Sequence, residues 1–227
     1  MTRRYGVPLA VMALSLAMAA CSSTKESSFY TLQTEASAQA PLASGSPLWV
    51  EVVPVQVPQQ VQRPQLVLDE GDGKVKIDEF HRWAGSLDDE VGAALSSALS
   101  RDLGAVDVYR TPVPAGRPVY RISVKVQRFD SAPGRRTALD AVWSVRRLPD
   151  SVTMTCRTAL QQPVAAGFPA LVAGHRAQIE QLAAQIGSAV QSLRAVPPST
   201  AEAAAAASGT PGVPAPAIPP CPVAGAA

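Results

Sequence analysis

Two segments of the chain repeat apolar residues at helical spacing. Between Ser86 and Gly104 the apolar positions that fall on one helical face are Leu87, Val91, Leu95, Ala98 and Leu103. Gly104 follows them, where a glycine commonly ends a helix. Between Pro169 and Ala195 the positions on one stripe are Ile179, Leu182, Ile186, Val190 and Leu193. We therefore predict two helices, each with one apolar face.

Most of the remaining sequence alternates in the manner of strands. The stretch VYRISVKVQRF from Val119 is the clearest case, and shorter alternating segments begin near Leu48, Val106, Ala138 and Ser151. A hairpin is predicted where QLVL and KVKIDEFHR flank the turn EGDG. Pro54 and Pro58 favour an edge or a bulge in the second half of the Leu48 segment. Together these patterns predict an α/β two-layer sandwich, with one mixed or mainly antiparallel sheet and two helices on one face.

The two ends of the chain differ from this middle part. Residues 1–20 combine Arg3 and Arg4 with a short apolar run, which is typical of an export signal. Cys21 follows Met-Ala-Ala as in a bacterial lipobox, so we predict lipidation at Cys21 and a lipidated tether over 21–28. The last segment, 197–227, is rich in Pro and Ala and is predicted to be disordered. One domain, 29–196, lies between them.

Two details near the ends leave alternatives. The segment FYTL from Phe29 either joins the domain or belongs to a longer tether that reaches Leu48. If it joins the domain, the eight residues from Cys21 to Phe29 span at most roughly 30 Å. Ser22 stands where Asp would resemble an inner-membrane retention signal, which favours the periplasmic face of the outer membrane.

Net charge argues against one class of partner. The chain has 20 Lys and Arg against 18 Asp and Glu. Removal of the export signal takes away Arg3 and Arg4 and no acid, so the mature chain is formally neutral. Such a chain has no overall field to attract nucleic acid, and we expect none as a partner.

The stretch IDEFHRWAGSLDDEV concentrates the polar residues that most resemble a chemical site. Its later acids fit the first turn of the predicted helix, with Ser86 as N-cap and Asp89 completing a capping box. His81 shares a strand face with Glu79, which allows the two to pair. A single histidine with scattered carboxylates is too few ligands for a metal, and no nucleophile motif occurs. We predict no catalytic residue, no cofactor and no metal site.

Several short motifs together resemble a known family. SSFYTL, VVPVQVPQQVQRPQLV, DEFHRWAGSLDDEV, YRISVKVQRFD and ALVAGHRAQIEQLAAQIGSAV occur in the order seen in ABC-type transport auxiliary lipoproteins, which include the paraquat-inducible lipoprotein C. The resemblance implies that the protein is not an enzyme. It implies instead an outer-membrane partner of transporters with mammalian-cell-entry (MCE) domains. Those transporters move phospholipids or other hydrophobic molecules across the periplasm and support envelope integrity.

The resemblance also suggests which residues form the core and which contact a partner. Most of the family's recurring positions here are apolar and expected in the core, while Arg63, Pro64, Arg82 and Trp83 are candidates for contact with a protein partner. Self-association into a homo-oligomer stays open. So does a rival function, a lipoprotein that binds the cell wall or regulates envelope assembly, because it would share the anchor and the small domain.

Two further cysteines lie beyond the lipobox. Cys156 falls in a predicted strand and Cys221 in the tail. In an oxidising compartment they either form a disulfide that ties the tail to the strand or remain two unpaired thiols. The pattern alone leaves both alternatives open.

The lipobox generates a direct prediction. Changing Cys21→Ala removes the acylated thiol, so the protein is expected in the soluble periplasmic fraction, because it loses its lipid anchor. Fractionation followed by immunoblotting measures this. A variant that stays with the membrane to the same extent as the wild type would contradict the anchor.

Overall fold

The computed structural model of the protein describes residues 26–34, 47–113, 115–197 and 220–222. The predicted export signal, Cys21 and most of the predicted disordered tail lie outside the described residues. Within the described part, no helix combines the length and the apolar composition needed to cross a membrane.

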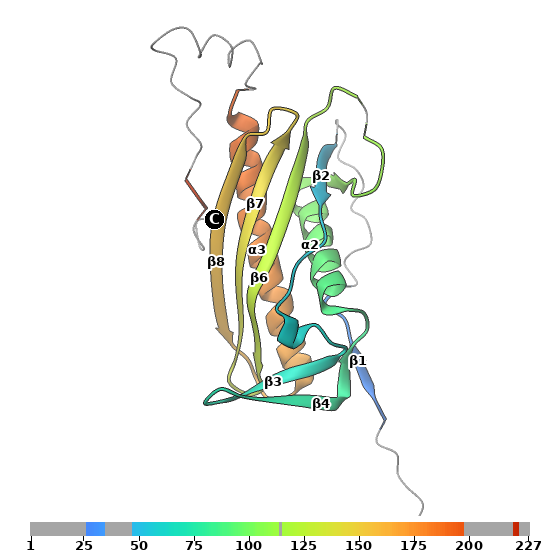
Figure 1. Ribbon diagram of the computed structural model, residues 1–227, viewed down its shortest axis with the longest axis vertical. Coiled ribbons are helices and arrows are strands. Elements are labelled where there is room, and N and C mark those ends of the chain that lie inside the picture. The colour runs from blue at the N-terminus through green and yellow to red at the C-terminus, as the bar shows by residue number, and fades with distance from the viewer. Residues whose placement is uncertain (1–25, 35–46, 114, 198–219, 223–227) are drawn as a thin grey trace, which may run out of the picture.

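The larger of two sheets has five strands (Figure 1). Its order is β5 (Ala105–Asp107), β2 (Leu48–Val52), β6 (Val119–Ala132), β7 (Arg136–Leu148) and β8 (Thr153–Pro163). β2 runs parallel to both of its neighbours, whereas β6, β7 and β8 are antiparallel. The sheet is therefore mixed, as the sequence predicts.

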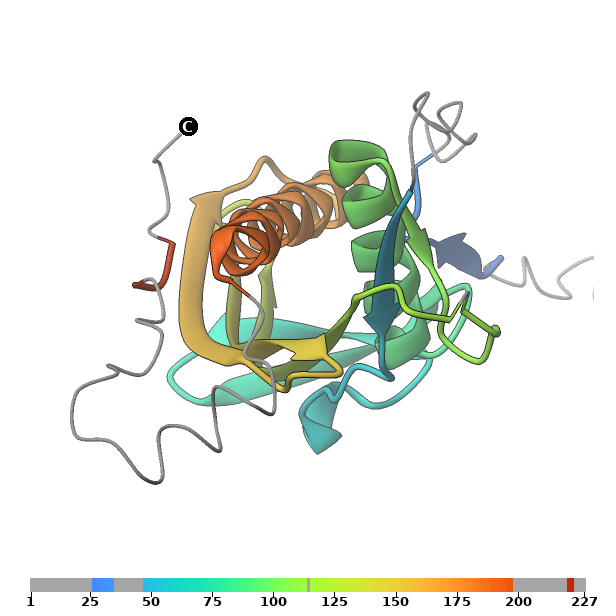
Figure 2. The ribbon, with the colours of Figure 1, turned by 90° about the horizontal axis from the view of Figure 1, so that it is seen from above.

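Two helices cover one face of this sheet, as Figure 2 shows from above. They are α2 (Leu87–Leu103) and α3 (Phe168–Ala195). Burial alternates along β6, and the buried residues on the face that the helices cover are Tyr120, Ile122, Val124 and Val126. The predicted stripe of α3 is buried along its whole length. The α/β two-layer prediction is confirmed.

Both ends of α2 follow from local sequence. Gly104 is the C-cap and has the left-handed conformation, at φ 59° and ψ 32°, that a residue with a Cβ rarely adopts. Ser86 is the N-cap residue, but its hydroxyl donates to the Asp89 carboxylate over 2.7 Å and makes no bond to a backbone N–H. The predicted capping box is therefore wrong. The predicted helix limits are confirmed.

The other strands form a separate small sheet at one end of the molecule. Its order is β1 (Ser28–Tyr30), β4 (Lys74–Trp83) and β3 (Gln65–Gly71). β3 and β4 are the predicted hairpin, and β1 pairs in parallel with the end of β4. The FYTL segment thus joins the domain rather than the tether.

The division into two sheets was not predicted, and its cause lies just after β2. Pro54 ends the regular pairing, and the next residues touch β6 only through an isolated bridge between Gln56 and Lys125. The short helix η3 (Gln59–Val61) then redirects the chain. The hairpin consequently begins away from the large sheet and crosses its end.

α3 lies very close to the neighbouring chain at Gly174. A Cβ there would lie 2.6 Å from Val164 Cγ1 and 2.8 Å from Thr137 Oγ1. We predict that Gly174→Ala lowers the free energy of unfolding by about 1–3 kcal/mol through overpacking. Chemical denaturation of the purified domain measures this change.

Gly92→Ala in α2 is the matched control, because its new Cβ would meet Val55 Cγ2 at an ordinary 3.7 Å. Alanine is the better helix former by roughly 1 kcal/mol, so this variant should be at least as stable as the wild type. Equal stability of the two variants would show that α3 does not need the close approach.

Candidate functional site

The acids at the start of α2 include one with a structural role. Glu90 is 6% exposed, and its Oε2 accepts hydrogen bonds from the Leu32 N–H and the Thr31 hydroxyl, both at 2.7 Å. This carboxylate therefore fastens the segment after β1 to α2. The sequence suggested only a favourable interaction with the helix dipole, because the partners lie 58 and 59 positions away.

His81 pairs with Asp78 instead of Glu79. Asp78 begins a bulge in β4, and its Oδ1 accepts from the backbone N–H groups of Phe80 and His81 and from His81 Nδ1 at 2.6 Å. Burial alone would raise the pKa of the Asp78 carboxyl, but these hydrogen bonds outweigh it and hold the pKa below its usual value. Simple strand alternation could not reveal this pair, because the bulge breaks the alternation.

The same imidazole joins three elements through its ring faces. It stacks on Phe168 at the start of α3, with ring centroids 3.5 Å apart, and lies 6.0 Å from the ring of Tyr30 in β1. His81 thus fixes the small sheet against α3. Among the described residues, no three His, Cys, Asp or Glu side chains converge in a way that could hold a metal ion.

The structure divides the predicted partner-contact residues. Arg63 and Pro64 are exposed, and Arg82 is half-buried with its Nε donating to the Glu79 carbonyl. Trp83 is only 4% exposed and packs edge-on against Phe129 in the core. Its indole is therefore not available to a partner, although its backbone N–H donates to the Pro64 carbonyl and so positions that loop.

A serine and a histidine lie together inside the sandwich. Ser131 Oγ is 2.8 Å from His175 Nε2, and the imidazole stacks on Phe129 with ring centroids 3.9 Å apart. Such a pair resembles a nucleophile with its base. His175 is completely buried, however, and burial lowers its pKa to about 3. The pair therefore joins α3 to β6 at a place that solvent does not reach.

The sequence analysis missed Arg147, which is 5% exposed. Its Nη1 donates to the carbonyls of Leu193 and Val196 at 2.5 and 2.6 Å, and its guanidinium pairs with Asp150. The carbonyls at the end of α3 are left without helical partners, so this arginine satisfies them. In the sequence it is one of two consecutive arginines, and no local pattern marks it as buried.

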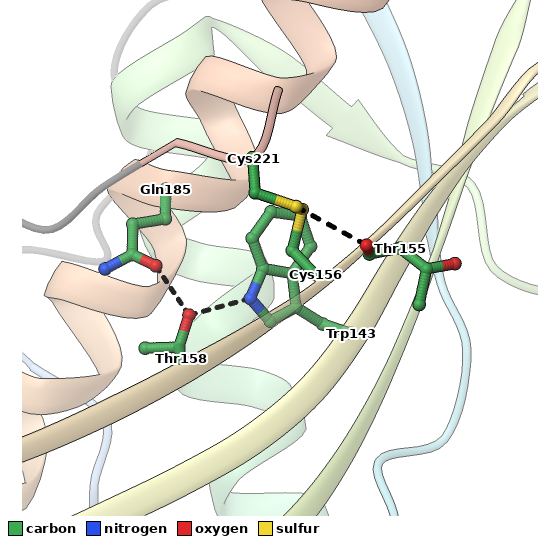
Figure 3. The surroundings of a disulfide bond; sticks show 6 residues. All are labelled: Trp143, Thr155, Cys156, Thr158, Gln185 and Cys221. Carbon is green, nitrogen blue, oxygen red and sulfur yellow. Dashed lines mark hydrogen bonds between the residues drawn. A yellow bond between two sulfur atoms is a disulfide. The ribbon is translucent and has the colours of Figure 1, made fainter. Parts of the chain in front are cut away.

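Cys156 and Cys221 form a disulfide that brings the described part of the tail onto β8 (Figure 3). Cys156 is buried, and the bond spans a separation of 65 residues. Sγ of Cys221 lies 3.4 Å from the Thr155 carbonyl oxygen, a contact rather than a hydrogen bond because a disulfide sulfur carries no proton. The sequence had left open whether these cysteines pair.

The neighbours of the disulfide tie β7, β8 and α3 together (Figure 3). Trp143 Nε1 donates to Thr158 Oγ1 at 2.8 Å, and that hydroxyl donates to Gln185 Oε1 at 2.5 Å. The expectation that the family's recurrent apolar positions are buried is confirmed for Leu32, Leu87, Tyr120, Phe129 and Trp143. It is wrong for Phe29 and Phe80, which are 64% and 36% exposed.

The architecture is thus an α/β sandwich with a small appended sheet. Comparisons with known proteins identify the family to which this chain belongs. The family described as ABC-type transport auxiliary lipoprotein component matches residues 30–187. The chain therefore belongs to the family of ABC-type transport auxiliary lipoproteins. No curated protein matches the sequence.

Solved structures share this fold. One is the crystal structure of an uncharacterised protein, with a TM-score of 0.57 and 18% identity, covering 73% of this chain and 99% of that one. Another is a protein from Xanthomonas campestris in the family DUF330, with a TM-score of 0.51 and 13% identity, covering 70% of this chain and 92% of that one. At these identities the likeness concerns the fold alone.

Burial of His175 generates a prediction on pH. Its pKa falls from 6.5 in the unfolded chain to about 3 in the folded protein. Between these two pH values the unfolded chain binds a proton at His175 and the folded protein does not. The contribution of His175 to the free energy of unfolding is fully present above about pH 6.5. It is lost as the pH falls towards 3, and the loss is on the order of a few kcal/mol.

The measurement compares the free energy of unfolding of the wild type and His175→Gln between pH 7 and 4. Glutamine can still bond to Ser131 but does not titrate in this range. The advantage of the wild type should therefore shrink as the pH falls. Parallel curves would contradict the buried neutral imidazole.

The disulfide is tested by thiol labelling. Mature protein that is denatured without reduction should show no reactive cysteine, because Cys156 and Cys221 are bonded and Cys21 is predicted to be acylated. Mass spectrometry after alkylation counts the labels, and a reduced sample provides the control with two. Two labels before reduction would show that the tail is not bonded.

Proposed function

We propose that this protein is a non-enzymatic lipoprotein subunit of an MCE-type ABC transport system. Anchored on the periplasmic face of the outer membrane, it binds a periplasmic MCE protein. In this way it supports the movement of phospholipids or other hydrophobic molecules across the periplasm and the integrity of the envelope. It takes no part in chemistry on the cargo.

The observation that carries the proposal is the extent of the family match. Residues 30–187 run from the end of β1 into the last third of α3, so the match includes the large sheet, most of the small sheet and α2. The likeness therefore concerns the whole domain rather than one motif. The lipobox at Cys21 is consistent with it, since an auxiliary lipoprotein needs an anchor.

A docking subunit needs a surface for its partner, and the loop before β3 supports one. Arg63 and Pro64 are exposed there, and the backbone bond between Pro64 and Trp83 holds the loop on the core. Arginine is enriched at the centres of protein interfaces, where its guanidinium can bind carboxylates. We assign Arg63 and Pro64 to this contact. Arg82, the other arginine predicted there, is half-buried and bonds to the Glu79 carbonyl, so it is not included.

The rival function, cell-wall binding or regulation of envelope assembly, makes a different prediction. A lipoprotein of that kind would copurify with peptidoglycan or with envelope-assembly factors and not with an MCE protein. Crosslinking of the native protein in cells, followed by purification and identification of its partners, separates the two.

The charge change Arg63→Glu tests the docking surface. We expect it to reduce copurification with the MCE protein by at least tenfold, which corresponds to about 1.4 kcal/mol, because it replaces an interfacial cation by an anion. The variant should remain folded, since the Arg63 side chain is exposed.

Arg157→Glu, an equal charge change at an exposed position on β8, is the matched control and should copurify like the wild type. Full copurification of Arg63→Glu would remove this residue from the interface. If the wild-type protein copurifies with no MCE component and its deletion leaves envelope permeability unchanged, the transport function itself is wrong.

A further inference from the structure

The exposed apolar side chains of the molecule are concentrated on the small sheet. Among the described residues, four large apolar side chains are exposed: Phe29 at 64%, Val75 at 58%, Ile77 at 38% and Phe80 at 36%. All four belong to β1 or β4. Single exposed apolar residues are common on soluble proteins, but a cluster of this kind marks a surface that is covered by something else.

Strand register shows that three of these residues, Phe29, Val75 and Ile77, share one face. Residues directly opposed in a ladder point to the same side, and the opposed pairs are Phe29 with Arg82, Arg82 with Gln65, Val67 with Ile77, and Asp69 with Val75. Alternate residues of β3 therefore line this face, whereas Leu66 and Leu68 between them are buried. We call the side with Phe29, Val75 and Ile77 the outward face.

The outward face is held in a fixed position relative to the large sheet. Arg136 Nη2 donates to Asp69 Oδ2 at 3.0 Å, and Arg135 Nη2 donates to the Asp69 carbonyl at 2.5 Å. Arg135 lies in the turn between β6 and β7, and Arg136 is the first residue of β7. At the other end of β4, His81 stacks on Phe168 of α3. The apolar surface is thus already formed before anything binds to it.

Chain length limits what this face can meet. At about 3.3–3.6 Å per residue, the eight residues from Cys21 to Phe29 keep β1 within roughly 30 Å of an acylated Cys21. Figure 1 shows β1, β3 and β4 together at one end of the molecule, opposite the C-terminal end of α3. The short tether therefore leads to the end that carries the apolar face.

The charges around the hairpin are nearly balanced. Lys74 and Lys76 are exposed there, and so are the acids Glu70, Asp72 and Glu79. A surface of this composition has little long-range attraction for anionic lipids, so contact with a bilayer would depend on its apolar side chains. Apolar side chains such as Phe29 and Ile77 can be buried at the boundary between headgroups and acyl chains.

We propose that the outward face of the small sheet lies on the bilayer that holds the anchor, with Phe29, Val75 and Ile77 inserted among the lipid headgroups. This rests on the acylated Cys21 of the proposed function. Arg82, which shares the face, then lies near lipid phosphates, while Arg63 in the preceding loop remains available to the protein partner. The anchor and the sheet together hold the domain in one orientation on the membrane.

The test uses the full lipidated protein in vesicles of phosphatidylethanolamine and phosphatidylglycerol, without any transporter. With Cys156 and Cys221 in the disulfide, a Val75→Cys variant has one labelled thiol, which carries a polarity-sensitive fluorophore. We expect nitroxide-bearing lipids to quench this label several-fold more strongly than the same label in the control Arg157→Cys on β8. Added Phe29→Thr and Ile77→Thr changes, which replace apolar side chains by a residue that is also favoured in strands, should reduce the quenching. Salt at 0.5 M should not.

Each other outcome has a definite meaning. Equal quenching of the two labels, or none at either, would overturn the docked orientation and leave the anchor intact. A Val75 label that is protected from aqueous iodide but not quenched by lipid would assign the face to a second copy and overturn the proposal. Failure of the protein to float with the vesicles would refute the anchor itself, and copurification with the MCE protein tests the transport function separately.

Discussion

Burial of the apolar stripe of α3 against the large sheet is the interaction on which the rest of the structure depends. The stripe meets the core-facing residues of β6, β7 and β8, which would otherwise be an apolar sheet face open to water. Each fully buried large aliphatic side chain contributes about 1.5–3 kcal/mol, so this layer provides much of the driving force for folding. α2 then covers β2 and β5, and the small sheet closes one end.

Polar groups fix where α3 lies along that apolar surface. Ser131 meets His175 near the start of the helix, Thr158 meets Gln185 further along, and Arg147 binds the carbonyls at its end. A shift of the helix by one turn would leave each of these buried groups without its partner, at a cost of about 1–3 kcal/mol per group. Apolar contacts thus stabilise the packing of α3 on the sheet, while the buried hydrogen bonds fix its position along the sheet.

The sequence predicted the elements better than their arrangement. Helical spacing identified both helices, and the end of α2 at Gly104 followed from the conformational freedom of glycine. The separate small sheet could not be foreseen, because it results from a redirection of the chain at η3 rather than from any strand's own pattern. Local alternation also missed the pairing of His81 with Asp78, which depends on a bulge.

The candidate site shows the same limit. The sequence recognised Arg82 and Trp83 as a pair of interest, but only packing could separate the half-exposed arginine from the buried indole. Glu90 and Arg147 looked like ordinary surface charges, and their partners are distant in sequence. Long-range partners of this kind leave no periodic signal in the chain.

The bond between Cys156 and Cys221 has a mechanical consequence. It encloses α3 in a covalent loop that begins at β8 and ends in the tail. A pull on the chain beyond Cys221 is therefore transmitted to β8, in the middle of its pairing with β7, and not to the last turn of α3. Strands loaded along their length resist separation together, whereas a helix loaded at its end peels away turn by turn. Tension applied to the chain beyond Cys221 is thus borne by β8 and not by the helix that holds the layers together.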